Sequence, residues 1–386
     1  METIGKSRQR QHAAQRTSVN ILRYIMDHPS ATRRTVAEDL ALSFPNVCRI
    51  IAGFQDNGTV TVDELKQVGK RGPRSRTLSL RNKIGATIGI DLEATHLRAV
   101  ALDYANEVVA VLREPVPYAA SAEDLVALVA EMAKDMVGLA RKEALEVHAV
   151  GLGLPGPVID ESTGRAHTEI QTGLCEIEFV PAAAKASGLP TFSAANTLCF
   201  AVGHHRFRHP RRQDTDMVVL NRFGLGVCVL RQQDMFSGEL GLLPYCQGAD
   251  AVRYRDVCTG ASLLRFARGC GDFRDLHIIV SSPDDPLVRQ WLIAATPAFA
   301  QAVYCGIVMF APDRVVIEGI FTNLPEHVRA SIIETVTGEL ETVGLSVPTI
   351  GLFEGDDLMG ARGAALVARD RVVDEVLTQL VHATRS

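Results

Sequence analysis

Hydrophobic residues recur along the first sixty positions with the spacing of three short amphipathic helices. The first covers residues 19–26 and ends before Pro29, because proline cannot continue a helix. Thr32 can cap the second helix, and Ser43 can cap the third. The third helix carries one apolar stripe, made of Val47, Ile50, Ile51 and Phe54. The opposite face of this third helix is polar near its N-terminal end, which is typical of the recognition helix of a helix-turn-helix protein.

Two strand-like segments follow these helices. Residues 59–62 and 77–80 alternate between apolar and polar side chains, and the segment 69–76 between them is rich in basic residues. A two-stranded wing of this kind would place its basic tip beside phosphates or in the minor groove. A small helical cap with a solvated basic loop is the alternative interpretation. We expect DNA contacts from Arg33, Arg34, Ser43, Phe44, Asn46, Arg49, Lys70, Arg71, Arg74 and Arg76.

From residue 85 onward, strand-like and helical blocks alternate. The first group of blocks covers residues 86–92, 96–103, 107–112, 121–144 and 147–154. A similar order recurs after residue 216 and includes a long apolar helix over residues 286–309. This alternation predicts an α/β body with two similar lobes. We predict three domains, which are a winged helix-turn-helix over 1–82, a first lobe over 83–205 and a second lobe with C-terminal helices over 206–386.

One glycine motif invites a different interpretation. Gly151, Gly153 and Gly156 spell G-x-G-x-x-G after a predicted strand. A dinucleotide site needs a helix to begin there, so that the helix N-terminus faces the pyrophosphate. Pro155 and Pro157 do not favour a helix start, and we therefore reject a nicotinamide cofactor site.

The charge of the chain changes sign where the predicted head ends. Residues 1–82 hold 14 Lys and Arg against 7 Asp and Glu, whereas the remaining residues hold 26 against 38. A basic head on an acidic body indicates that the head alone meets a polyanion such as nucleic acid. The chain shows no signal-peptide pattern, we find no apolar run long enough to span a bilayer, and the eight cysteines lack C-x-x-C spacing. We predict a cytoplasmic protein with free thiols and no membrane partner.

Taken together, the motifs of this chain resemble the ROK family, which groups sugar-responsive repressors with sugar kinases. The resemblance implies a winged helix-turn-helix followed by two lobes of the actin-like ATPase (ribonuclease H-like) α/β fold. The segments that carry it are residues 69–73, 89–99, 153–158, 188–196, 221–227, 238–242 and 312–319. They are similar, in this order, to the family's wing, first phosphate loop, G-x-P-G-P-V turn, sugar-site segment, second phosphate loop, G-E-I-G-H segment and third nucleotide strand.

This chain departs from the family pattern where a kinase needs its catalytic groups. The family's catalytic Asp falls on Ala194, and the preceding Asn falls on Ser193. Glycines that approach phosphate are replaced by Glu93 and Glu318, and the Thr of the second loop by Leu225. A carboxylate at contact distance repels a phosphate charge by about 4 kcal/mol at an effective dielectric constant of 20. The resemblance therefore implies a body that is not an enzyme and does not bind ATP.

The family's zinc site is also altered in this sequence. The zinc-binding His falls on Leu242, and Cys246 and Cys258 cannot form a four-ligand site by themselves. We expect no metal cofactor. Glu239 is retained and could accept hydrogen bonds from hydroxyl groups, with a simple turn carboxylate as the alternative. The resemblance and the sequence nominate the effector-binding residues Ser193, Asn196, Glu239, Gly156 and His167.

A run of histidines and arginines over residues 204–212 has two interpretations. It could form a proton switch or metal site, but charge runs more often form solvated surface, so we favour a solvated basic loop.

The sequence as a whole predicts a DNA-binding transcription regulator, a repressor of carbohydrate-metabolism genes. We expect it to bind double-stranded operator DNA as a homodimer or a dimer of dimers, and to respond to a sugar or another small polar effector. The first alternative is a sugar kinase that carries an added DNA-binding head. The second is a body without any ligand that serves only for dimerisation.

Overall fold

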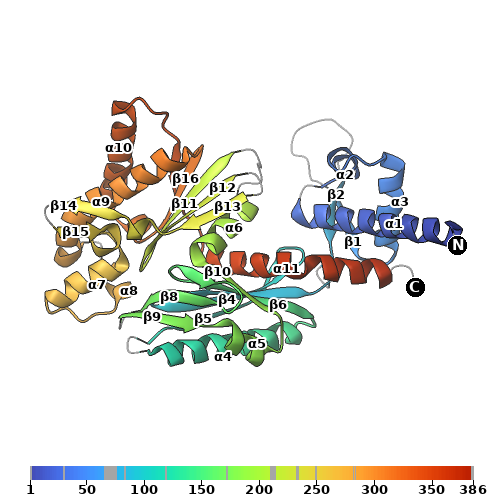
Figure 1. The fold of residues 1–386 in the computed structure, drawn as a ribbon, viewed down its shortest axis with the longest axis horizontal. Coiled ribbons are helices and arrows are strands. Elements are labelled where there is room, and N and C mark those ends of the chain that lie inside the picture. Colours follow the sequence, from blue (N-terminus) through green and yellow to red (C-terminus); the bar gives the residue numbers. More distant parts are fainter. Residues whose placement is uncertain are drawn as a thin grey trace.

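The computed structural model shows an N-terminal head, residues 2–80, beside two α/β lobes (Figure 1). The residues that the structure describes are 2–28, 31–64, 76–81, 84–117, 120–170, 173–208, 214–231, 234–247, 250–280, 282 and 284–383. A long C-terminal helix lies between the head and the lobes and touches both, so the order of elements along the chain differs from their order in space (Figure 1).

The head contains three helices and one antiparallel pair of strands, as its hydrophobic pattern predicts. These elements are α1 (Glu2–Asp27), α2 (Arg33–Asp39), α3 (Phe44–Asp56), β1 (Val60–Glu64) and β2 (Arg76–Leu80). The Thr32 hydroxyl caps α2 by accepting a hydrogen bond from the Thr35 amide, whereas Ser43 occupies the N-cap of α3 without a side-chain cap bond. The α3 stripe faces the core of the head, with only Ile50 half-buried. The predicted helix that ends near Pro29 is confirmed, and it begins much earlier than residue 19.

The first lobe is built on a five-stranded sheet with the order β10-β6-β3-β4-β5. Its elements are β3 (Ala86–Leu92), β4 (His96–Asp103), β5 (Val108–Pro115), α4 (Ala122–Lys142), β6 (Val147–Leu154), β7 (Val158–Asp160), β8 (Arg165–Ile170), β9 (Gly173–Glu178), α5 (Val180–Ser187), β10 (Thr191–Ala195) and α6 (Asn196–Arg208). The helix α4 buries its apolar face against one side of the sheet. The strand after β6 is β7, so the helix start that a dinucleotide site requires does not follow the G-x-G-x-x-G segment.

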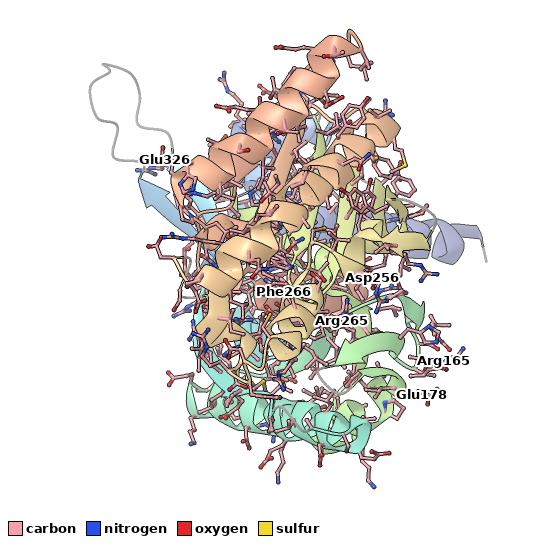
Figure 2. All side chains as sticks on the ribbon, turned by 90° about the vertical axis from the view of Figure 1, so that its left-hand side faces the viewer. Arg165, Glu178, Asp256, Arg265, Phe266 and Glu326 are labelled. Carbon is pink, nitrogen blue, oxygen red and sulfur yellow. The ribbon has the colours of Figure 1, made fainter. Side chains whose placement is uncertain are left out.

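The second lobe repeats the plan with the strand order β13-β12-β11-β16-β17. Its strands are β11 (Thr215–Asn221), β12 (Leu225–Arg231), β13 (Asp234–Gly238), β14 (Pro244–Gln247), β15 (Asp250–Arg253), β16 (Arg314–Gly319) and β17 (Thr349–Leu352). Its helices are η2 (Leu240–Leu242), η3 (Tyr254–Asp256), α7 (Gly260–Gly269), α8 (Leu276–Val280), α9 (Pro286–Phe310), η4 (Ile320–Asn323) and α10 (Glu326–Thr342). Figure 2 shows Arg265 and Asp256 of the second lobe, which form an exposed ion pair, and Arg165 and Glu178, which face each other across β8 and β9 of the first lobe.

The helix α9 corrects one expectation from the sequence. By length and composition it is apolar enough to cross a membrane, so the expectation that no apolar run is long enough is wrong. Half of its apolar window is buried inside the second lobe, where Trp291, Phe299 and Val303 belong to the lobe core. The same apolar pattern is also typical of a buried core helix, and the sequence alone did not distinguish a core helix from a membrane-spanning one.

The last helix, α11 (Met359–Ala383), belongs in space to the first lobe, although its residues follow those of the second lobe. It lies on the first sheet against β3 and β6, and it packs beside α6. Two glycines in these strands make the approach possible. A Cβ atom at Gly89 would lie 1.9 Å from the Ala361 carbonyl oxygen, and one at Gly151 would lie 2.0 Å from that of Ala364.

A single hydrophobic cluster joins the head to α11. On the α11 side it contains Val373, Val376, Leu377 and Val381, and on the head side it contains Ile21, Leu22 and Ile25 of α1. Ion pairs border this cluster, with Arg23 of α1 3.0 Å from Asp374 of α11 and Asp27 of α1 bound by Arg206 of α6. The head is therefore held on the body by a shared core, and not only by its chain connection.

Candidate functional site

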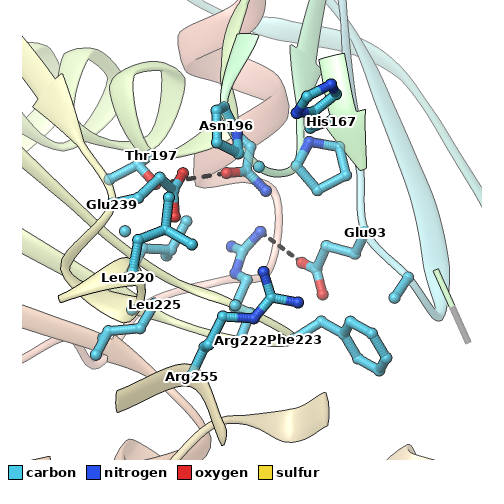
Figure 3. Close-up of a pocket in the computed structure, with 18 of the residues that line it drawn as sticks. Glu93, His167, Asn196, Thr197, Leu220, Arg222, Phe223, Leu225, Glu239 and Arg255 are labelled. Atoms are coloured by element: carbon cyan, nitrogen blue, oxygen red, sulfur yellow. Dashed lines mark hydrogen bonds and ion pairs between the residues drawn. The ribbon is translucent and has the colours of Figure 1, made fainter. Parts of the chain in front are cut away.

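A cavity of about 250 Å³ lies between the two lobes (Figure 3). The first lobe contributes Glu93 after β3, the turn 155–157 after β6, His167 of β8 and the first residues of α6. The second lobe contributes the turn 222–226 between β11 and β12 and the segment around Glu239. Each group stands at the end of a strand or at the start of a helix, so the two sheets position the wall of the cavity.

Four of the five nominated effector residues line this cavity, namely Asn196, Glu239, Gly156 and His167. The fifth, Ser193, does not line it. Its side chain is buried, and its hydroxyl donates a hydrogen bond to the Glu161 carbonyl oxygen at 2.8 Å. Ser193 lies within β10, and none of the residues of β10 lines the cavity, whereas Asn196 begins α6 and does line it.

Three polar side chains of the cavity differ in their partners. The Asn196 side chain belongs to the first residue of α6, and its Oδ1 atom accepts a 3.5 Å hydrogen bond from the Thr197 hydroxyl. The His167 ring is held 3.0 Å from the Glu176 carboxylate. Burial raises the pKa of Glu239 to about 7, and the nearby positive charge of Arg255 limits that rise. Glu239 therefore changes protonation state near neutral pH.

A largely buried cluster of charges closes the deep end of the cavity. The Arg222 guanidinium lies 2.8 Å from Asp91, 2.5 Å from Glu93 and 2.9 Å from Glu318. Arg98 approaches Glu93 to 2.5 Å as well. Because Asp91 and Glu93 belong to the first lobe and Arg222 and Glu318 to the second, these ion pairs connect the lobes.

The pKa values of this cluster reflect burial and pairing together. Burial raises the pKa of Asp91 to about 6, even though Arg222 pulls it down. Burial also opposes the charge on Glu93, but Arg222 and Arg98 outweigh it and hold the pKa of Glu93 below its usual range. Burial disfavours the charge on Arg222, yet Glu318, Glu93 and Asp91 together keep the pKa of Arg222 above its ordinary value.

This cluster refines what the sequence implied about phosphate. We treated Glu93 as a lone carboxylate that would repel a phosphate group, but in the structure Arg222 and Arg98 neutralise it. A second cavity, of about 180 Å³, shares Arg222 and Glu93 with the first and is also lined by Glu318 and Asp357. The carboxylates and the arginine thus place paired protein charges on the walls of both cavities.

Sequence reasoning missed Arg222. Its position falls in the segment that resembles the second phosphate loop. In the structure it lies beside Glu93 and Glu318, the two glutamates at positions where the family has glycines. A basic residue gained together with two acidic residues is a signal of charge compensation, and it could have suggested the cluster.

Ala194, at the position of the family's catalytic Asp, lies in β10 and is 2% exposed. It packs with Cys199 and Ala364 and does not line the cavity. Leu242, at the position of the family's zinc-binding His, lines the cavity and is partly exposed. Within the described ranges, no three His, Cys, Asp or Glu side chains come together in a way that could hold a metal ion. The Cys258 thiol is buried, and the side chain of Cys246 lies outside the described residues.

The basic run corrects another expectation. Residues 204–208 form the end of α6 and not a solvated loop. His204 is buried between the rings of Phe200 and Phe353, and His205 lies 3.4 Å from Asp216. Residues 209–213 lie outside the described residues.

The head presents a polar face at the N-terminal end of α3. Phe44 is 52% exposed, Arg49 is exposed, and the Arg49 guanidinium donates a 2.8 Å hydrogen bond to the Asn46 side-chain oxygen. Ser43 is exposed next to them. This pair and its neighbours form one continuous surface at the start of the helix.

The other nominated head residues differ in position. Arg34 is exposed on α2, whereas Arg33 donates a hydrogen bond to the Gln55 side chain and so ties α2 to α3. Arg76 is exposed at the start of β2. The nominated wing residues Lys70, Arg71 and Arg74 lie outside the described residues.

The two similar sheets, the helices packed on them and the cavity between them define an α/β protein with the architecture of actin-like kinases. Residues 87–246 match the family described as "ROK family", and the chain therefore carries a ROK family domain. A comparison with curated proteins finds no match to this sequence.

Solved structures of this family share the fold. A ROK family transcriptional regulator, described as a homolog of the E. coli MLC protein, superposes with a TM-score of 0.69 at 16% identity, over 97% of this chain and 100% of its own. The ROK hexokinase of Thermus thermophilus gives 0.59 at 21% identity over 75% and 99%, and a ROK family glucokinase of Streptomyces griseus, solved with glucose and AMPPNP, gives 0.59 at 18% over 74% and 100%. The kinases thus leave about a quarter of this chain uncovered, whereas the regulator covers nearly all of it.

Proposed function

We propose that this protein is a DNA-binding transcription regulator whose head is a winged helix-turn-helix. The observation that carries the proposal is the exposed face of α3, where the hydrogen-bonded Asn46 and Arg49 side chains stand beside exposed Phe44. Asn and Arg are suited to the base edges of A and G in the major groove. The antiparallel pair β1–β2 would serve as the wing, and its basic connection, including Lys70, Arg71 and Arg74, would contact the backbone or minor groove.

The body supports a sensing role better than phosphotransfer. Alanine at position 194 offers no carboxylate to take a proton from a sugar hydroxyl, and Arg222 is paired with carboxylates of both lobes at the cavity wall. We propose that a small effector binds in the 250 Å³ cavity, and that the regulated genes serve carbohydrate metabolism as targets of a cytoplasmic repressor. A homodimer or dimer of dimers would place two heads on two half-sites.

In the domain division that we propose, the head covers 1–82, the first lobe 83–205 and the second lobe 206–386, with α11 assigned in space to the first lobe. This helix offers a route from cavity to head. Its first turn lies against the charge cluster, since a Cβ atom at Gly360 would lie 2.1 Å from Asp91, and its far end packs in the head core through Leu377. An effector that binds two lobe arrangements with different affinity would thereby shift the position of the heads.

The test is fluorescence anisotropy of the full-length protein on DNA from upstream of its own gene, titrated with salt. Asn46→Ala and Arg49→Ala should each weaken specific binding by about tenfold to a hundredfold, because a good side-chain contact to a base is worth about 1–3 kcal/mol. Binding to random DNA should change much less. Arg141→Ala, an exposed arginine in the last turn of α4 on the body, is the matched control.

If both α3 variants keep their preference for the upstream DNA, α3 is not the recognition helix. If the wild-type protein binds upstream and random DNA equally, and with the same dependence on salt, the regulator proposal fails as a whole.

A further inference from the structure

We propose that Phe44 makes α3 selective for thymine, by placing its ring against the C5-methyl group of a thymine in the major groove. This thymine lies about two base pairs from the base that Arg49 reads. The inference rests on the proposed DNA-binding function and specifies part of the sequence that the same helix recognises. The bound DNA site therefore contains at least one thymine whose methyl group is needed for tight binding.

Phe44 exposes apolar surface where the head is otherwise polar. Its side chain is 52% exposed, and among the head residues whose burial the structure describes it is the only large apolar side chain that is exposed. Other apolar residues of α3, namely Val47, Ile51 and Phe54, are buried in the head core. Phe44 is the first residue of the helix and does not belong to that core. Its ring therefore leaves apolar surface available to a ligand of the head.

The position of Phe44 places this apolar surface where a recognition helix reads bases. The helix α3 lies on the side of the head away from the two lobes (Figure 1), and the N-terminal residues of a recognition helix contact base edges. On the same helix, the Arg49 guanidinium donates a 2.8 Å hydrogen bond to the Asn46 side chain, an arrangement suited to a purine. Pro45 fixes its own φ angle and so limits the motion of the backbone next to Phe44.

The thymine methyl group is the apolar group on the major-groove edge of the bases. Side chains such as Phe make apolar contact with this methyl group, whereas adenine, guanine and cytosine present hydrogen-bond donors and acceptors there. A phenyl ring placed against a donor or an acceptor would remove its water without a replacement partner, which is unfavourable. The ring of Phe44 therefore favours thymine over the other three bases.

The spacing along α3 sets the distance between the two recognised bases. Arg49 follows Phe44 by five positions, which corresponds to about 7.5 Å along the axis of an α-helix. Successive bases of one DNA strand are about 3.4 Å apart. A helix that lies along the groove therefore places the ring and the guanidinium roughly two base pairs apart.

The experiment is fluorescence anisotropy of the full-length protein on short duplexes that carry the site located by nuclease footprinting upstream of its own gene. In a set of such duplexes, each thymine is replaced in turn by deoxyuridine, which lacks only the C5-methyl group. We expect at least one replacement to weaken binding by roughly threefold to tenfold, because the burial of one methyl group against the ring is lost. Replacements outside the reach of α3 should leave the Kd unchanged.

Variants show whether the Phe44 ring is the partner of that methyl group. Phe44→Ala should weaken binding of the thymine duplex at least as much as the deoxyuridine replacement does. In this variant, deoxyuridine at the sensitive position should have no further effect, since both changes remove the same contact. Phe44→Leu keeps an apolar side chain and should retain part of the response. Phe273→Ala is the matched control, because Phe273 is an exposed phenylalanine between α7 and α8 of the second lobe, and it should keep the full wild-type response.

Three outcomes would overturn the inference. They are a wild-type affinity that changes at no deoxyuridine position, a wild-type response that persists in Phe44→Ala, and a sensitive thymine more than about five base pairs from the base at which Arg49→Ala loses discrimination. The first measurement uses only the wild-type protein, so it stands even if a variant fails to fold. A failure of this inference alone leaves the preference for upstream over random DNA intact, whereas a failure of the regulator proposal removes that preference.

Discussion

Removal of the Arg222 guanidinium tests whether the buried charge cluster holds the lobes together. In Arg222→Met, a side chain of similar length replaces the arginine, and Asp91, Glu93 and Glu318 lose their shared partner. Removal of one partner from a buried ion pair costs about 3–5 kcal/mol, because the remaining charge is left without compensation. We expect a loss of stability of this size, since Asp91 is fully buried and Arg98 forms an ion pair with Glu93 but acts on Asp91 only through the weaker attraction of a more distant charge.

The only tryptophan of the chain provides the assay. Trp291 is buried in the core of the second lobe, where its ring lies 5.8 Å from that of Phe321. Its fluorescence in a urea titration therefore reports the unfolding of that lobe. Arg289→Met is the matched control, because Arg289 and Asp284 are 66% and 84% exposed and such surface pairs contribute about 0–1 kcal/mol.

A second variant separates the loss of charge pairing from the loss of packing. In the triple variant Arg222→Met, Asp91→Asn, Glu318→Gln, the two carboxylates that Arg98 does not pair with are removed, and stability should return toward the wild-type value. The single variant should also approach the wild type as the pH falls from 8 to 5, because its unpaired carboxylates then take up protons in the folded state. A loss below about 1 kcal/mol in Arg222→Met, or a triple variant no more stable than the single one, would refute this account of the cluster.

Two further predictions concern Glu239 in the cavity and the proposed absence of phosphotransfer. In the folded protein the pKa of Glu239 is about 7, above its ordinary value of 4.5, so this group lowers the stability as the pH rises from 4.5 through 7. The free energy of unfolding of Glu239→Gln should therefore increase relative to that of the wild type over that range, by at most about 3 kcal/mol in urea titrations above pH 7. A difference in unfolding free energy that does not change with pH would contradict the raised pKa of Glu239. With ATP, magnesium and a panel of hexoses, a coupled assay should detect no ADP release from the wild type. Ala194→Asp should also be inactive, because the added carboxylate does not displace Arg222 from its ion pairs. Sugar-dependent ADP release by the wild type would establish the kinase alternative.

The local elements of the fold could be read from the sequence because their signals lie within a few residues. The stripe of α3 and the cap at Thr32 depend on spacings of three or four positions, and both are present in the structure. The strands of both lobes follow from apolar blocks that sheet burial requires. The place of α11 could not be derived in this way, because it depends on contacts such as that between Gly89 and Ala361, far apart in the chain.

The residues of the candidate site also differ in whether nearby sequence could predict their role. Glu239 and Asn196 could be nominated because short motifs around them resemble a known family, and the structure brings both to one cavity. Arg222 could not be assigned a role from its own neighbourhood, since its partners come from Asp91 and Glu318 in other segments. Ser193 was nominated by the same motif as Asn196, but it lies within β10, where its hydroxyl donates a hydrogen bond to the Glu161 carbonyl oxygen and it does not line the cavity.

The charge cluster and α11 together explain how a body of this kind can respond to a ligand without catalysis. In the kinase solved with glucose and AMPPNP, the molecules bound include a nucleotide analogue, whereas here Arg222 itself joins carboxylates of both lobes. Because Glu93 and Arg222 line the cavity, a ligand bound there would compete with or reinforce these ion pairs. It would thereby change the free energy of the lobe arrangement that the ion pairs stabilise. Asp91 carries that change to the first turn of α11 at Gly360, and α11 is one continuous helix as far as the head core. If the proposed sensing role holds, a displacement of α11 at the charge cluster would reach the head through the core that the helix shares with it.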